Sequence, residues 1–405
     1  MKSHRNDPRL KLTMTPNPRH ILIYEPSVDG HHVGWLRFIT EDLLAAGFAL
    51  TLALDTRPAS LKRITDHMGD LLPKVNILPA VAEPGKKPST SQISACLQAS
   101  GAKLAFLAHF NDIASKLLRR AAFGWLPEPG LRGRLGGIYL RPQFLDSPGW
   151  SPNEHVKKAG FHRLMQDGWL NPLLLQDPLL YGVVREKYPR VSAGLLADPY
   201  PDDFQSERVP ARQRFNLAED QFILLFYGGA YKRKGLHLVA EAMLKMTSQS
   251  RAFLLCAGSQ PKDARLARQL ATLQAQGRAQ IRNHYVFAEE EKQLFAACDA
   301  VLLPYIQHQG ASAVLARAAG AGKPVVASDE NYIGRIVSQY DMGPLFPSGN
   351  VSALQQALVC VVTAPPDEFT RWRVGARAFG ETCSREVFRS SLVAALKAAL
   401  SVPGA

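Results

Sequence analysis

Short apolar runs alternate with helical segments along this chain, and the alternation is densest between Phe222 and Val326. FILLFYGG leads into the basic turn AYKRKG and a helix, AFLLCAG follows, and ACDAVLLPY precedes a polar loop, a small-residue helix and KPVVAS. Short apolar runs separated by helices are typical of parallel strands that are covered on both faces. The pattern therefore predicts an α/β fold with a Rossmann-like sheet in this region.

The same alternation begins at His20, so a second sheet is expected in the N-terminal half. HILIYEP, FALTLAL, KLAFLAHF and GGIYLRP read as strands, and VSAGLLAD closes this half. A chain of 405 residues favours two domains of about 200 residues each. We expect a disordered tail at 1–19, a first domain at 20–198, a linker at 199–220, a second domain at 221–380, and a C-terminal helix at 381–405 that crosses back to the first domain.

The chain has a formal net charge of +13, and its basic residues are most concentrated in residues 116–141. Glu128 is the only acid in that segment, against six basic residues: Lys116, Arg119, Arg120, Arg132, Arg134 and Arg141. Such a patch suits an anionic bilayer, a phosphate-bearing substrate or nucleic acid, and a solvated basic face is an equal alternative. The YKRKG turn is too short to predict nucleic-acid binding, and no stacking aromatics are interleaved with it.

Cysteine usage and hydropathy indicate the compartment. Five cysteines are scattered without CxxC spacing, which indicates core residues in a reducing compartment and no metal site. No signal-peptide core follows the polar N-terminus, and no apolar run approaches the roughly 18 residues of a spanning helix. We expect a cytoplasmic protein, soluble or peripheral at the membrane. It lacks the GxGxxG turn, the P-loop ending and the Gly-x-Ser-x-Gly elbow of other α/β enzymes.

Two segments of the C-terminal half suit a diphosphate. Lys234 lies in the basic turn, where its ammonium could neutralise a departing diphosphate. Gly310, Ala311 and Ser312 open a helix, and their small side chains would let a phosphate reach the backbone amides. Ser312 could also cap that helix. The alternatives are an exposed basic turn and small residues that only permit tight helix–sheet packing.

In the N-terminal half, Asp29, Gly30, His31 and His32 follow the first strand, at the edge where open α/β sheets bind ligands. His31 or His32 could act on an acceptor hydroxyl or phosphate, and surface or cap roles are equally open. His109 ends a later strand at a comparable position, so it is a second candidate for this site. The alternative is a buried core histidine whose hydrogen bonds are all made within the protein. These residues predict the side from which an acceptor approaches.

The order of these segments resembles the group 1 glycosyltransferases: a strand with a KG turn, LLCAG, YVFAEEEKQLFAACDAVLLPY, a polar loop and GKPVV. The resemblance covers most of residues 21–396 and is strongest in 190–360. It implies the GT-B architecture, in which two Rossmann-like domains with parallel sheets face each other across a cleft. It also implies retaining transfer of a sugar from a nucleotide donor, with no required metal or other cofactor, to an acceptor held mainly by the first domain.

The resemblance assigns roles residue by residue. Lys234 matches the lysine of the family's KG turn, and His109 corresponds to a histidine found near the donor sugar. The family's arginine, five residues before the lysine, is Gly229 here. Lys232 or Arg233 could substitute for it in binding the donor.

Two family glutamates, eight residues apart, fall on Gln309 and Arg317. In the family the first contacts the donor sugar and the second the nucleotide ribose. Gln309 can still hydrogen-bond sugar hydroxyls through its amide, whereas Arg317 cannot accept from a ribose and could instead pair with a phosphate or an added acid on the donor. Donor identity is therefore open, and loss of activity is an alternative.

We predict a glycosyltransferase that moves a sugar from a nucleotide-diphosphate donor to a glycan or lipid-linked acceptor, with retention. The donor phosphates bind between Lys234 and residues 310–312, and the acceptor approaches from the side of His31 and His109. The main alternative is a non-catalytic protein that binds sugar nucleotides or scaffolds polysaccharide assembly, and a third is a sugar-nucleotide epimerase. Contact of segment 116–141 with an anionic inner membrane face is a separate prediction.

Overall fold

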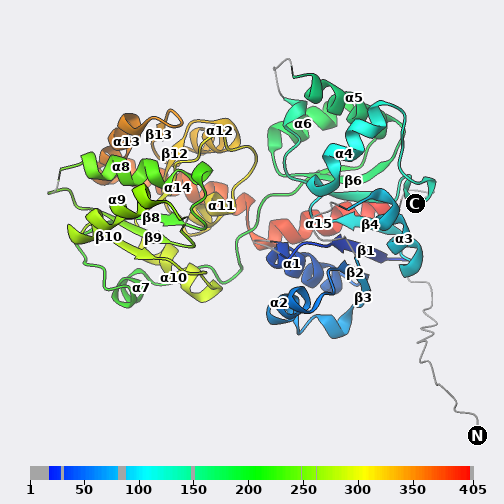
Figure 1. Cartoon of the computed structure of the whole chain (residues 1–405), viewed down its shortest axis with the longest axis horizontal. Helices are drawn as coiled ribbons and strands as arrows, with labels where there is room; N and C mark the ends of the chain where they lie inside the picture. Colours follow the sequence, from blue (N-terminus) through cyan, green and yellow to red (C-terminus); the bar gives the residue numbers. More distant parts are fainter. Residues whose placement is uncertain are drawn as a thin grey trace, which may run out of the picture.

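The computed structural model describes residues 18–28, 32–80, 88–146, 151–247, 249–260 and 262–401. Within these ranges the chain forms two lobes, on the right and left of Figure 1, each built around one sheet. Every pairing between neighbouring strands is parallel. The predicted α/β fold with two Rossmann-like domains is therefore confirmed.

The first sheet has the strand order β3-β2-β1-β4-β5-β6-β7. All six residues of β1 are buried, as expected for a parallel strand with helices on both faces. The strands are β1 His20–Glu25, β2 Ala49–Leu54, β3 Asn76–Pro79, β4 Leu104–Leu107, β5 Leu135–Tyr139, β6 Leu170–Leu175 and β7 Ala193–Leu195. The helices are α1 His32–Ala45, α2 Pro58–Met68, α3 Thr90–Ser100, α4 Asn111–Ala122, α5 Pro152–Gln166 and α6 Pro178–Lys187, with the 3-10 turns η1 Leu72–Lys74, η2 Pro129–Leu131 and η3 Gln143–Leu145.

The second sheet has the strand order β10-β9-β8-β11-β12-β13. Its strands are β8 Phe222–Tyr227, β9 Ala252–Ala257, β10 Ala279–Arg282, β11 Ala300–Leu303, β12 Val325–Ser328 and β13 Leu345–Phe346. The helices of this part of the chain are α7 Arg208–Arg214, α8 Leu236–Lys245, α9 Ala264–Ala275, α10 Ala288–Ala297, α11 Ala313–Gly320, α12 Asn331–Tyr340, α13 Val351–Thr363, α14 Pro366–Thr382 and α15 Arg385–Leu400, with the 3-10 turn η4 Lys232–Lys234.

In both sheets the strand order reverses between two central strands. The reversal lies between β1 and β4 in the first sheet and between β8 and β11 in the second. Loops that leave such a pair of strands diverge and open a crevice at the carboxyl ends, where ligands bind. β1 ends at Glu25 and β4 leads to His109, while β8 leads to Lys234 and β11 leads to Tyr305. The topology therefore gathers these four residues at the two ligand-binding edges.

The last helix, α15, packs on the first domain although it follows the second in sequence (red in Figure 1). Phe388 and Leu392 are buried in the core of the first domain. Arg385 forms a buried ion pair with Asp42 of α1, and its guanidinium lies 4.3 Å from the centre of the Phe38 ring. Removing one member of such a pair leaves the other charge buried and unpaired, which costs about 3–5 kcal/mol. Helix α15 thus connects the second domain to the core of the first domain.

Helix α7 lies inside the segment that was expected to be a linker. Its Arg212 is fully buried and forms an ion pair with Asp299 at 2.6 Å. Arg212 also donates to the Ala297 and Gln221 carbonyls, and Asp299 accepts from the N–H of Ile223 at 2.7 Å. Because Arg212 pairs with Asp299 and Ala211 is buried in the core of the second domain, α7 packs as part of that domain.

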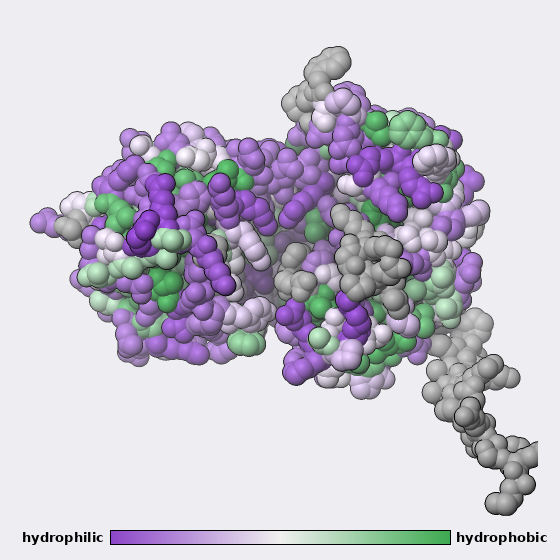
Figure 2. Space-filling view, in the orientation of Figure 1, coloured by the Kyte–Doolittle hydropathy of each residue, from purple (hydrophilic) through white to green (hydrophobic). Residues whose placement is uncertain are grey.

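The described residues contain no helix that is both long and apolar enough to cross a lipid bilayer. The face of the molecule shown in Figure 2 is mostly hydrophilic, and hydrophilic side chains line the groove between the lobes. A polar ligand therefore fits this groove better than an apolar one.

Candidate active site

The turn after β8 holds Lys234 against Tyr305. The next residue, Gly235, has a φ of 74°, and a Cβ there would lie 1.9 Å from the Pro304 carbonyl oxygen, so the turn needs glycine. The Lys234 ammonium donates to the Tyr305 hydroxyl at 2.5 Å and lies 3.9 Å from the ring centre. The Tyr305 hydroxyl is in turn 3.3 Å from that of Ser312. The structure thus brings Lys234 and Ser312 together through one tyrosine.

The loop after β11 leads into α11 with an open helix start. Gly310 has a φ of 92°, a conformation that favours glycine. Ser312 occupies the N-cap position, but its side chain makes no cap hydrogen bond and contacts Tyr305 instead. The prediction that Ser312 caps this helix is therefore wrong. Since the N-cap side chain does not bond to the first-turn N–H groups of α11, these groups are open to water or a ligand.

Arg233 contacts a histidine rather than an acid. Its Nη1 lies 2.9 Å from Nδ1 of His308, and an arginine can donate only to an unprotonated nitrogen. Burial, with the charges of Lys234 and two arginines, lowers the pKa of His308 to about 4, so His308 is neutral at pH 7. Gly229 brings no charge, and Lys232 lines a separate cavity of about 310 Å³ between α8 and α9. The cations of this turn near the start of α11 are therefore Lys234 and Arg233.

The structure separates Gln309 from Arg317. Arg317 is bound to the buried Glu291, with Nε 2.5 Å from Oε1, and it also donates to the Ala313 carbonyl. Gln309 is exposed and lines a cavity of about 130 Å³ against the first domain. Arg317 is thus already neutralised within the second domain, whereas Gln309 faces the other domain.

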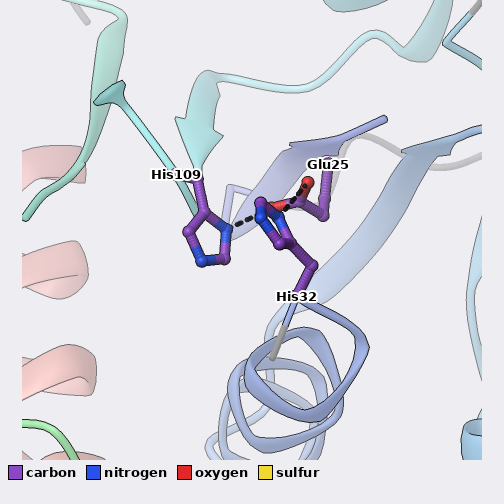
Figure 3. A group of neighbouring side chains, drawn as sticks. All are labelled: Glu25, His32 and His109. Atoms are coloured by element: carbon purple, nitrogen blue, oxygen red, sulfur yellow. Dashed lines mark hydrogen bonds and ion pairs between the residues drawn. The ribbon is translucent and has the colours of Figure 1, made fainter. Parts of the chain in front are cut away.

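A buried carboxylate lies at the carboxyl edge of the first sheet (Figure 3). Oε2 of Glu25 is 2.5 Å from Nδ1 of His109, Oε1 is 3.0 Å from Nδ1 of His32, and the Ser27 N–H donates as well. The two imidazole rings lie 3.8 Å apart between centres. Burial alone would raise the pKa of Glu25, but the hydrogen bonds from His109 and His32 lower it to about 2. An ionised carboxylate therefore orients both imidazoles.

The same three side chains have the donor set of a metal site. One ligand atom from each of Glu25, His32 and His109 lies within 4.8 Å of the others, and two histidines with a carboxylate suit zinc. The hydrogen bonds to Glu25 also account for the arrangement without an ion. The absence of a required metal therefore stays a prediction. Three other predicted residues lie outside the described residues: Asp29, Gly30 and His31.

Asp198, which follows β7, interacts electrostatically with residues of both sheet edges. Burial raises its pKa to about 6, against the opposing effects of Arg317, a hydrogen bond from Trp35, His109 and Lys234. Its Oδ1 is buried and has no hydrogen-bond partner among the described residues. Because Asp198 interacts electrostatically with residues of both domains, the His109 edge and the Lys234 edge lie close to one carboxyl group.

Sequence reasoning missed three carboxylates of this region. Glu25 gave a signal, because it is the one charged residue that ends the apolar run HILIYE. Asp198 also ends an apolar run, but its neighbours in the sequence are more acids and prolines. Glu291 gave no signal in the sequence, because it is one of three consecutive glutamates in α10 and nothing distinguishes it from the other two.

Residues 221–364 match the family model described as Glycosyl transferases group 1. The matched segment runs from the residue before β8 to the residue after α13, and it contains Lys234 and the loop at 309–312. No curated protein matches the sequence of the chain.

Solved structures resemble the whole chain. The sucrose-phosphate synthase of Thermosynechococcus elongatus is 17% identical, with a TM-score of 0.69 over 94% of this chain and 98% of that chain. A glycosyltransferase from Rickettsia africae ESF-5 is 14% identical, with a TM-score of 0.70 over 95% and 100%. HepE of Anabaena in complex with UDP is 15% identical, with a TM-score of 0.67 over 94% and 100%. At these identities the likeness shows the fold, which is the GT-B architecture.

Proposed function

Because residues 221–364 form a group 1 glycosyl transferase domain within a GT-B fold, we propose that this protein transfers a sugar from a nucleotide-diphosphate donor to a glycan or lipid-linked acceptor. The observation that carries the proposal is Lys234, held 2.5 Å from Tyr305 at the strand reversal of the matched domain. HepE of Anabaena has been solved with UDP and with UDP-glucose, which supports a donor of this class.

The donor diphosphate binds between Lys234 and the start of α11. As the bond between the sugar and the diphosphate breaks, negative charge grows on the leaving oxygen, and a fixed ammonium stabilises that charge. Arg233 supplies a second cation. The amides of Gly310 and Ala311 carry no bulky side chain, so a phosphate can approach them closely.

The transfer proceeds with retention and without a metal ion. The C–O bond to the diphosphate breaks, the acceptor oxygen bonds to the same face of the anomeric carbon, and the acceptor proton passes to the departing phosphate oxygen. A phosphate oxygen thus serves as the base. The cations around Lys234 support this route, because they stabilise the departing group while it forms. The coupling constant of the product's anomeric proton, measured by NMR, would show retention or inversion.

His109 contacts the donor sugar from the first domain. Glu25 binds its Nδ1 at 2.5 Å and so fixes the ring orientation. Asp198 is close enough to interact with both His109 and Lys234, which supports a sugar position between the two sheet edges. His109→Ala should therefore lower donor turnover, and rotation of the ring in Glu25→Ala should lower it as well.

The first experiment is a thermal-shift screen of nucleoside diphosphates and their sugars. A ligand at 100 times its Kd stabilises the native state by about 2.7 kcal/mol. The nucleotide that raises the melting temperature is then tested as a sugar donor, with mass spectrometry of the products. If no nucleoside diphosphate shifts the melting temperature, the proposal fails.

A second candidate is a non-catalytic protein that binds sugar nucleotides or scaffolds polysaccharide assembly. The ion pair of Arg317 with Glu291 favours it, because neither residue is then free to bind a ribose. Calorimetric binding of a nucleoside diphosphate, with no donor hydrolysis and no transfer to any acceptor, would favour this candidate over the enzyme.

We also propose that the protein acts in the cytoplasm, with peripheral contact at the anionic inner membrane face through α4. Lys116, Arg119 and Arg120 are exposed on this helix. Phe123 and Trp125, which follow it, are 71% and 64% exposed. Exposed aromatic rings beside cations suit the headgroup region of a bilayer. Reversing the charge at Arg119 and Arg120 should reduce sedimentation with anionic vesicles, and unchanged sedimentation would contradict this contact.

A further inference from the structure

A cavity of about 130 Å³ lies between the two domains, beside the proposed donor site. Its first-domain walls come from α4, from the segment at the end of β5 and from α5, and its second-domain wall is Gln309. Apart from one alanine, one phenylalanine and one tyrosine, the lining is polar or charged, and it includes Asn111, Ser115, Arg141, Gln143, Lys157 and Gln309. We call it the Arg141 cavity.

The Arg141 cavity adjoins the start of α11. A Cβ on Gly310 would lie 3.0 Å from the Leu140 carbonyl oxygen and 3.3 Å from Cγ of Arg141. The two domains therefore touch at the residue after Gln309, in the loop that leads into α11. A molecule in the cavity would lie next to a donor whose phosphates occupy that helix start. A donor and an acceptor must bind at adjacent positions, because the reacting atoms must approach to about 3–3.5 Å.

Positive charge exceeds negative charge at this cavity. Arg141 and Lys157 have no carboxylate within ion-pair distance among the described residues. Glu154, on the same face of α5 as Lys157, is the single acid among the described lining residues. Burial and the charge of Arg233 across the cleft lower the pKa of Arg141. A bound anion would relieve the repulsion between these two arginines.

The amide side chains of the cavity are hydrogen-bond donors. Oδ1 of Asn111 accepts from the N–H of Leu140 at 2.8 Å, so its amide N–H groups remain to bind a ligand. The amides of Gln143 and Gln309 can each donate to and accept from a hydroxyl. Amides together with two cations suit a hydroxylated ligand that carries an anionic group.

We propose that the Arg141 cavity is the acceptor site and that the acceptor is a sugar with a phosphate or carboxylate group bound by Arg141 and Lys157. This inference rests on the proposed glycosyl transfer and adds the chemical class of the acceptor. The guanidinium of Arg141 can bind either anion through two parallel N–H bonds, whereas Lys157 acts as a point charge.

The test titrates three probes into the full-length protein, alone and saturated with the nucleoside diphosphate found in the thermal screen. The probes are glucose 6-phosphate, glucuronate and glucose. We expect at least one anionic probe to bind about tenfold more tightly than glucose, which corresponds to about 1.4 kcal/mol. The phosphate and carboxylate arms show which anion the site prefers. Equal binding of all three probes, or binding of none, would overturn the inference.

Variants assign the effect to the cavity. Arg141→Ala and Lys157→Ala should each weaken binding of the anionic probe about tenfold. Arg141→Lys should retain part of the affinity. Lys158→Ala, an exposed neighbour on α5 that does not line the cavity, is the matched control and should change affinity less than about twofold. Melting temperatures check that all four variants fold.

Nucleotide affinity separates this inference from the proposed function. Arg141→Ala should leave the affinity for the nucleoside diphosphate within about threefold. If Arg141→Ala weakens binding of the nucleotide as much as binding of the anionic probe, Arg141 belongs to the donor site and the inference is overturned. If the unmodified protein binds no nucleoside diphosphate, the proposed function fails, whereas the probe titrations still decide whether the cavity binds anionic sugars.

Discussion

The carboxyl edges of the two sheets differ in electrostatic character. In the second domain, Lys234 lies beside a neutral His308 and a helix start without a side-chain cap. In the first domain, Glu25 is buried and ionised between His32 and His109. The positive charge that a diphosphate needs therefore comes from the second domain, while the first domain offers oriented imidazoles.

Glu25 and Asp198 show what decides the charge of a buried carboxyl group. Both are buried, yet the pKa of Glu25 is lowered to about 2 and that of Asp198 is raised to about 6. Glu25 accepts from two imidazoles and one backbone N–H, whereas one oxygen of Asp198 has no partner among the described residues. Hydrogen-bond donors, more than depth of burial, set the charge at these two positions.

The largest effect is expected from Lys234→Ala. Removal of a group that stabilises charge in the transition state lowers the rate about 100- to 1000-fold. Donor turnover should fall by that factor, measured as kcat/KM with the matching sugar nucleotide. Lys232→Ala, in the same turn but facing another cavity, is the matched control and should keep most of the activity. Unchanged turnover in Lys234→Ala would contradict the claim that the second domain supplies the positive charge for the diphosphate.

The next largest effect is expected from Glu25→Gln. The folded-state pKa of Glu25, about 2, lies below its ordinary 4.5, so the ionised group stabilises the native state above pH 4.5 and loses that effect as the pH falls toward 2. The substitution should remove about 3 kcal/mol of unfolding free energy at pH 7 and less at pH 3. Urea denaturation at both pH values measures this, with exposed Glu207→Gln as the control. An equal loss at both pH values would show that Glu25 acts through packing alone.

Asp198→Asn should have a smaller effect of opposite sign. The folded-state pKa of Asp198, about 6, lies above its ordinary 3.8, so ionisation of Asp198 destabilises the native state as the pH rises from 3.8 to 6. The substitution should raise the unfolding free energy by about 2 kcal/mol at pH 8 and change it little at pH 3.5. Thermal unfolding across this pH range is the measurement. A gain that does not depend on pH would argue against a buried, proton-binding Asp198.

The smallest effect is expected from metal removal. If hydrogen bonds to Glu25 are the reason that His32 and His109 lie together, dialysis against a chelator should leave donor turnover within about twofold. Loss of activity that added zinc restores would instead make these three residues a metal site. That result would also overturn the prediction that no metal is required.

Much of the fold follows from the sequence, because parallel strands covered on both faces must be short and apolar. The alternation from His20 and from Phe222 predicts both sheets, and the predicted family resemblance agrees with the match of residues 221–364 to the group 1 family model. The KG turn also pointed to Lys234. Its contact with Tyr305 did not follow from the sequence, because 71 residues separate the two and the pairing of β8 with β11 brings them together.

The rest of the site depends on contacts between distant segments. Glu25 and His109 are 84 residues apart and meet because β1 pairs with β4. The Ser312 hydroxyl was expected to cap α11, but the hydroxyl of Tyr305 competes for it. Arg317 was predicted to bind a phosphate or an added acid on the donor, and its partner in the structure is Glu291 from the neighbouring helix.

The central claim is that Lys234 of the second domain binds the donor's diphosphate. It is tested most directly by calorimetric affinities for a nucleoside diphosphate and the matching monophosphate, on the unmodified protein and on Lys234→Ala. The account predicts that the unmodified protein prefers the diphosphate by about tenfold or more and that Lys234→Ala loses this preference. An equal preference in both proteins would contradict it.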